Sequence, residues 1–276
     1  MDNGKYEFTG ETKIVDGRTL HRIRSIITFP PVEAGEIGGW IETEGNLSAS
    51  GESWVFDDAE VYGDAEVFED AMVFGRAKVY GGAKVHGRAR VCGGAEVYGS
   101  ARVCGGAEVS GGARVYGGAK VSDEAEVFDF AKVFGDAWVH GYAKVFDEAE
   151  VYGGADVFGD AWVYDKADVY GLAKVHDRAR VFGGADVFGD AVVFCNAEVS
   201  GDAKVSCDAD YICVKNNWSS MRWFTYTRSN KRWRVGCFCG TGDELVKKAY
   251  ADSEKSGKCY EAIVRAVETI EVATTE

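Results

Sequence analysis

A six-residue repeat without insertion or deletion occupies most of the chain. From Val55 every sixth residue through Val205 is valine, and from Ala59 every sixth residue through Ala209 is alanine. A helix does not explain this period, because successive valines would lie about 240° apart on its surface. A short strand followed by a corner does. Alanine and the valine two places later share one strand face, and the glycine or aspartate second after each valine suits a corner. The repeat therefore predicts a parallel β-helix.

A longer period of 18 residues indicates the cross-section of this β-helix. One column of residues that directly follow valines, taken at this spacing, is wholly aromatic: Tyr62, Tyr80, Tyr98, Tyr116, Phe134, Tyr152, Tyr170 and Phe188. Residues 18 apart therefore share an environment, which means three hexapeptides per turn and a three-sided prism. At one strand spacing per turn, the repeats make about 8.7 turns and a rod about 40 Å long.

Three segments follow from the limits of the repeat: residues 1–53, 54–210 and 211–276. In the first, Asp16-Gly17 separates two apolar runs and predicts a hairpin that caps the open sheet edge of the rod. The pattern of residues 211–276 predicts a small α+β domain, in which a hairpin precedes two helices. Thr241 and Glu244 are expected to form a capping box at the start of the first helix. The predicted fold class is an all-β solenoid with an N-terminal β cap and a small C-terminal α+β domain.

The start of the repeat resembles a known family. The stretch AGEIGGW at 34–40, NLS at 46–48 and Trp54-Val55 are similar to the entry segment of the YdcK-like hexapeptide-repeat proteins of bacteria and their phages. The resemblance implies a left-handed β-helix and an acetyltransferase activity that, in this family, is inferred from the fold. In this chain the glycine is second after valine, whereas hexapeptide acyltransferases usually have a small residue first after it, so no catalytic residue is carried over.

A second resemblance concerns the C-terminal segment. The stretch AYADSEKSG at 249–257 is similar to the ends of uncharacterised proteins from phages and prophages of gut Firmicutes. This resemblance implies a phage or prophage origin. It implies no activity.

Charge is distributed unevenly over a chain whose net charge is −14. Residues 54–210 hold 28 acidic and 15 basic side chains, whereas residues 211–276 hold eight acidic and eleven basic ones. No apolar run approaches the length of a membrane span, and no signal-peptide pattern follows Met1. We therefore expect a cytoplasmic protein, located in the host cytoplasm if phage encoded, with reduced cysteines and no membrane partner.

The histidines of the repeat are the first candidates for chemistry. His86, His140 and His176 share a column but lie three and two turns apart, about 14 and 10 Å, which is too far to bind one metal within one chain. No nucleophile, phosphate-loop or metalloprotease motif occurs. We therefore expect no metal, no cofactor and no catalytic residue, and favour a protein that is not an enzyme.

The aromatic column allows two interpretations. Its rings can stack on each other from turn to turn and stabilise the rod alone. Alternatively, the eight residues from Tyr62 to Phe188 form an exposed apolar stripe that binds a partner or a second copy of the chain.

The C-terminal hairpin is a second candidate surface. Between Lys215 and Arg234 lie six bases and no acid, interleaved with aromatic residues. Such a mixture neutralises phosphates and stacks on bases, so a nucleic acid or another partner is expected there if anywhere. The alternative is a cap whose tryptophans cover the last turn of the rod while its arginines face water. The candidate residues are Trp223, Arg228, Lys231, Arg232, Trp233 and Arg234.

Three functional classes agree with these patterns. The favoured one is a non-catalytic, phage- or prophage-encoded scaffold that presents a rigid rod and its C-terminal domain to a host protein. The second is an acidic mimic of nucleic acid that inhibits a host nucleic-acid or defence enzyme; the bases in residues 76–120 do not suit it. The third is a hexapeptide-type acyltransferase.

Overall fold

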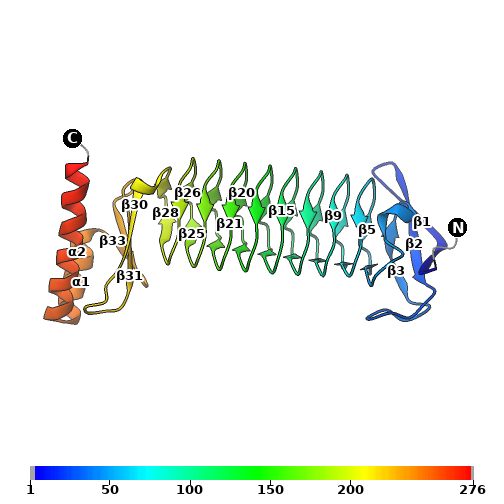
Figure 1. Ribbon diagram of the computed structural model, residues 1–276, viewed down its shortest axis with the longest axis horizontal. Helices are drawn as coiled ribbons and strands as arrows, with labels where there is room; N and C mark the ends of the chain where they lie inside the picture. The colour runs from blue at the N-terminus through cyan, green and yellow to red at the C-terminus, as the bar shows by residue number, and fades with distance from the viewer. Residues whose placement is uncertain (1–3, 275–276) are drawn as a thin grey trace.

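The computed structural model describes residues 4–274 and shows a straight rod with a smaller unit at each end (Figure 1). The rod is a parallel β-solenoid with three sides, as the 18-residue period predicts. Each strand of the rod, except the last on each side, pairs in parallel with the strand 18 residues later, for example Glu60 with Lys78 and Val61 with Val79. The predicted fold class is therefore confirmed.

The strands of the rod are mostly two residues long and alternate among the three sides, called A, B and C below. Side A contains β5 (Glu60–Val61), β8 (Lys78–Val79), β11 (Glu96–Val97), β14 (Arg114–Val115), β17 (Lys132–Val133), β20 (Glu150–Val151), β23 (Asp168–Val169), β26 (Asp186–Val187) and β29 (Lys204–Val205). Side B contains β4 (Trp54–Val55), β7 (Met72–Val73), β10 (Arg90–Val91), β13 (Glu108–Val109), β16 (Glu126–Val127), β19 (Lys144–Val145), β22 (Trp162–Val163), β25 (Arg180–Gly183) and β28 (Glu198–Gly201). Side C contains β6 (Glu66–Val67), β9 (Lys84–Val85), β12 (Arg102–Val103), β15 (Lys120–Val121), β18 (Trp138–Val139), β21 (Asp156–Val157), β24 (Lys174–Val175) and β27 (Val192–Val193).

The core of the rod consists of the repeated valines and alanines. From Val55 through Val205 each of them is at most 1% exposed. Burying one valine side chain stabilises the fold by about 1.5 kcal/mol or more before chain entropy is subtracted. The last alanine of the repeat, Ala209, differs because it lies in the 3₁₀ turn η2 (Asp208–Asp210) and is exposed.

Each corner of the rod requires a left-handed backbone. Every residue second after a repeat valine, from Asp57 through Gly201, has a positive φ angle. Glycine adopts this conformation without strain, and aspartate tolerates it better than most residues. A side chain would also crowd the next turn, since a Cβ atom on Gly63 would lie 3.1 Å from the backbone nitrogen of Gly81. The predicted corner is confirmed, and Glu69 and Cys195 occupy it as well.

The N-terminal cap continues side A of the rod. Strands β1 (Tyr6–Val15) and β2 (Arg18–Ser25) form the predicted hairpin, and β3 (Ile37–Ile41) pairs antiparallel with β2 and parallel with β5. The cap thus supplies the first strand of this side and occupies its open edge.

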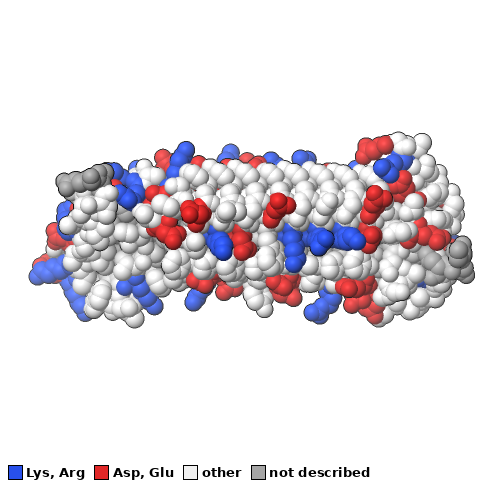
Figure 2. Space-filling model, turned by 45° about the horizontal axis from the view of Figure 1, so that its top comes forward, with Lys and Arg blue, Asp and Glu red and all other residues white. Residues whose placement is uncertain are grey.

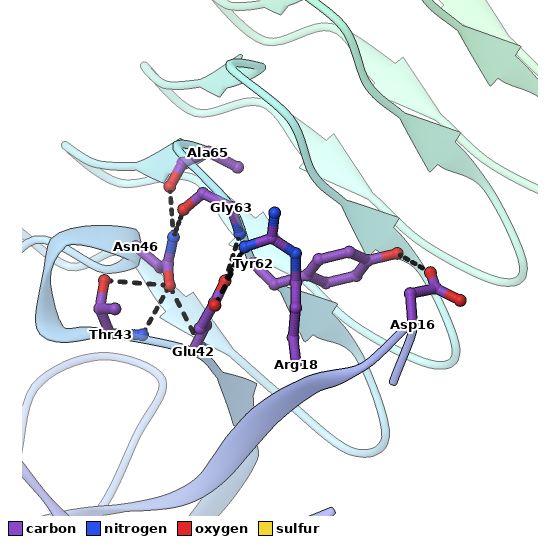
Figure 3. Close-up of polar contacts among 8 residues, drawn as sticks. All are labelled: Asp16, Arg18, Glu42, Thr43, Asn46, Tyr62, Gly63 and Ala65. Carbon is purple, nitrogen blue, oxygen red and sulfur yellow. Dashed lines mark hydrogen bonds and ion pairs between the residues drawn. The ribbon is translucent and has the colours of Figure 1, made fainter. Parts of the chain in front are cut away.

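Polar side chains join the cap to the first turn (Figure 3). Asn46, at the end of the 3₁₀ turn η1 (Glu44–Asn46), is buried, and its amide nitrogen donates to the carbonyl oxygens of Gly63 and Ala65 at 2.9 Å each. Its amide oxygen accepts the backbone N–H groups of Glu42 and Thr43. One side chain therefore satisfies four backbone groups at the place where the repeat begins.

The C-terminal unit differs from the predicted two-stranded hairpin. It is a four-stranded antiparallel sheet of β30 (Tyr211–Lys215), β31 (Trp223–Thr227), β32 (Arg232–Val235) and β33 (Phe238–Gly240). A turn at Gly236, whose φ is 57°, divides the second strand of the hairpin, which was expected from Arg232 to Cys239. Two helices follow, α1 (Gly242–Asp252) and α2 (Glu254–Ala273), and the capping box of Thr241 and Glu244 is confirmed.

The two faces of this sheet have different neighbours. One face, with Phe224, Tyr226 and Trp233, forms a core with the helices, whereas Tyr211 on the other belongs to the core of the rod. The idea that tryptophans cover the last turn is therefore wrong for Trp233, because this residue packs beneath the helices.

Neither helix of the described chain is both long enough and apolar enough to cross a membrane.

Candidate functional site

The aromatic column forms a continuous stack on the rod. The rings of its eight residues, Tyr62 to Phe188, lie parallel to within 8°, and neighbouring centroids are 4.8–5.2 Å apart. Each inner ring therefore covers the faces of its two neighbours, and the side chains from Tyr80 to Phe188 are half-buried. Burial raises the pKa of Tyr80 to about 12. This geometry supplies the stacking ladder; binding of a partner or of a second copy along the column stays a prediction.

The histidines of the repeat belong to another column on a different corner, where the rings form two separate stacks. His86 stacks on Phe68 at 4.7 Å, and His176 lies between Phe158 and Phe194 at 4.7 and 5.7 Å. His140 stacks on Phe158, and its Nε2 atom lies 3.1 Å from Asp156. The described residues contain no cluster of three or more metal-ligating side chains. The histidines are therefore members of ring stacks.

The candidate residues of the hairpin do not form one surface. Near α2, Lys231 Nζ lies 3.9 Å from Glu271, and Arg228 donates to the hydroxyl of Thr274. Arg232 is exposed, and Trp233 is only 1% exposed within the core of the C-terminal unit.

Arg234 and Trp223 instead lie toward the rod. Arg234 forms an ion pair with Glu198 at 3.0 Å, and its guanidinium lies over the ring of Phe182 at 4.8 Å. Trp223 is half-buried, 5.7 Å from the ammonium of Lys215. A single nucleic-acid surface made of all six predicted residues is therefore wrong, because the sheet directs them to different sides.

Cys237 and Cys239 differ from what their spacing predicts. They are two residues apart near the end of the second strand expected in the hairpin, which places both on one face and favours core thiols. Both residues are exposed, since Cys237 is in the turn after β32 and Cys239 is in the edge strand β33.

Trp223 and Arg234 line a cleft where the C-terminal unit meets the rod, called the junction cleft below. Its volume is about 690 Å³. Side B of the rod contributes Lys144, Trp162, Arg180 and Glu198, and the corner between sides C and B contributes Tyr142, Asp160, Arg178 and Asn196. The C-terminal unit contributes Met221, Arg222, Trp223, Thr225, Arg234 and Gly236.

The part of this cleft that the rod supplies is not apparent from the sequence. Tyr142, Arg178 and Arg222 are distant in the chain, and only the docking of the C-terminal sheet against side B brings them together. The 18-residue period places Arg178 two turns after Tyr142 at the same corner. It does not show which corner the C-terminal unit covers.

Comparison with models of protein families gave no match, and neither did a search of curated proteins. The similarity to YdcK-like proteins and the phage origin therefore stay predictions.

Proposed function

We propose that the protein is a non-catalytic scaffold, in which a rigid rod holds the C-terminal unit and offers it to a protein partner. The observation that carries this proposal is the uninterrupted rod. From Trp54 to Val205 tight corners join the strands, and the inward places are filled by valine and alanine. Such a solenoid has a filled interior and keeps its two ends at a fixed separation.

The surface of the C-terminal unit supports a protein as the partner. Trp218 is 69% exposed, Met221 63% and Ile270 52%. Large exposed apolar side chains, tryptophan and methionine in particular, are typical of protein interfaces. The resemblance of residues 249–257 to phage and prophage proteins supports a host protein as this partner.

The two alternatives have less support. Acyltransferases of this fold normally use loops to build an acceptor site, and within residues 54–205 no loop leaves the rod.

A mimic of nucleic acid needs carboxylates along its surface. On side C, however, Lys84, Arg102 and Lys120 occupy three adjacent strands in register, and Figure 2 shows basic side chains in a row along the rod.

Capture experiments with matched variants test the scaffold. We expect the full chain to capture one protein from a host lysate, and Trp218→Ser with Ile270→Ser to lose it. The control pair Phe130→Ser with Leu172→Ser removes apolar side chains of the rod that are at least as exposed, and it should retain the partner. Loss of capture with the rod pair alone would contradict the proposed role of the C-terminal unit. Turnover of acetyl-coenzyme A by the purified protein would contradict a non-catalytic role.

A further inference from the structure

The junction cleft concentrates positive charge on an acidic chain. Its lining contains five cationic side chains and two carboxylates, whereas the whole chain has a net charge of −14. Two of these cations have partners: Lys144 Nζ lies 2.8 Å from Glu126, and Arg234 Nε lies 3.0 Å from Glu198. The others are three arginines that form no ion pair with any residue from 4 to 274.

These three arginines come from separate elements. Arg180 is in β25 on side B, Arg178 is in the corner just before it, and Arg222 directly precedes β31. All three are exposed toward solvent. A guanidinium offers a planar fork of N–H donors that matches the oxygens of a phosphate, and a concave site strengthens the field of its charges. The cleft therefore attracts an anion with several oxygens, and Asp160 is the remaining carboxylate that opposes it.

Aromatic side chains share the cleft with the arginines. Trp162 and Trp223 are half-buried in its lining, and Tyr142 is 65% exposed at the corner. The guanidinium of Arg180 lies over the ring of Trp162, 4.8 Å from its centroid, so this cation covers one face of this ring. Aromatic side chains in a positively charged groove stack on nucleic acid bases.

We infer that the junction cleft binds a nucleoside phosphate, either free or at the end of a single strand. The arginines bind the phosphate, and Trp223 and Tyr142 contact the base. The aspartate and glutamate side chains of an acidic peptide would pair with the arginines, but they carry no ring that could stack on these aromatic residues. A long strand lying on the rod is disfavoured, because residues 121–165 hold eleven acids and two bases.

The test measures the anisotropy of a labelled short oligothymidylate at several salt concentrations. Arg178→Ser with Arg222→Ser should weaken binding about tenfold or more, and should reduce the slope of log affinity against log salt by about 1.4. Lys231→Ser with Arg232→Ser is the matched control, since it removes the same charge from the C-terminal unit outside the cleft. This control should change affinity and slope little. Trp223→Ala should weaken binding without changing the slope.

Competition then separates the two sources of the ligand. Displacement of the labelled strand by thymidine monophosphate would identify a free nucleotide as sufficient, and displacement only by strands would identify a strand end; either supports the site. The inference is overturned if no strand binds at low salt, or if the control pair weakens binding as much as the arginine pair. It is also overturned if a glutamate-rich peptide binds more tightly than thymidine monophosphate and the labelled strand do.

Discussion

At the scale of single residues, aspartate can replace glycine at the corners because its side chain forms a compensating hydrogen bond. The carboxylates of Asp57, Asp165 and Asp177 each accept the N–H of the corner residue one turn later, at 3.0–3.1 Å. Glu69 does the same toward Gly87 at 2.7 Å. These bonds offset the strain of the left-handed backbone, which costs a non-glycine residue roughly 1 kcal/mol or more. They explain why most corner residues are either glycine or aspartate.

The tyrosines of the ladder predict a pH dependence of stability at the same scale. Burial raises the pKa of Tyr80 to about 12, and it also raises the pKa of Tyr98, Tyr152 and Tyr170. In the unfolded chain each titrates near pH 10. Between about pH 10 and pH 12 the unfolded state therefore binds fewer protons, and the free energy of unfolding falls as the pH rises.

Urea unfolding at a series of alkaline pH values measures this effect. Tyr80→Phe with Tyr98→Phe keeps the rings and removes two titrating hydroxyls, so its stability should fall less steeply than that of the wild type. The absorbance of tyrosinate in the folded protein supplies the control, because it reports ionisation directly. Parallel curves for both proteins would contradict the prediction.

At the scale of elements, side-chain oxygens complete the three sides of the rod at its last turn. Along the rod, the first residue of each strand donates its N–H to an alanine carbonyl one turn later, as Glu60 does to Ala77. The last strands have no such turn. Side-chain oxygens take the place of these alanine carbonyls. Asp208 accepts the N–H of Val192 at 2.9 Å, Thr225 accepts that of Glu198 at 2.9 Å, and Ser229 accepts that of Lys204 at 2.7 Å.

Thr225 offers the sharpest test of this arrangement, because it is only 2% exposed. Thr225→Val keeps the shape of the side chain but leaves the N–H of Glu198 without its acceptor. We expect the free energy of unfolding to fall by about 1–3 kcal/mol, measured by urea unfolding. Thr225→Ser keeps the hydroxyl and should lose less. A valine variant as stable as the wild type would show that another group accepts this N–H.

The sequence predicts the repeated elements far better than the ends. Each rod strand obeys the same local rule, so valine, alanine and the corner residue specify it without knowledge of the rest. The roles of Thr225 and Ser229 depend on how the C-terminal sheet is placed on the last turn, and no period describes that contact. For the same reason the junction cleft and its arginines could not be predicted, although the bases near Arg222 indicated an anion.

At the scale of the whole molecule, both end units protect open strands. The cap continues side A through β3, Asp208 of η2 covers β27, and the C-terminal unit covers β28 and β29. A solenoid without such ends presents a row of unpaired backbone groups on every side.

Removal of the C-terminal unit tests its protective role. A chain that ends after Ser206 exposes the last strands of all three sides while its Val-Ala core from residue 55 to 205 stays intact. We expect such chains to associate end to end through these strands, which sedimentation detects as a larger species and electron microscopy as rods of greater length. Replacing Glu198 and Lys204 by proline in the shortened chain removes two of the outward N–H donors and should suppress the association. A shortened chain that stays monomeric and retains its β-rich circular dichroism spectrum would mean that the C-terminal unit serves binding alone.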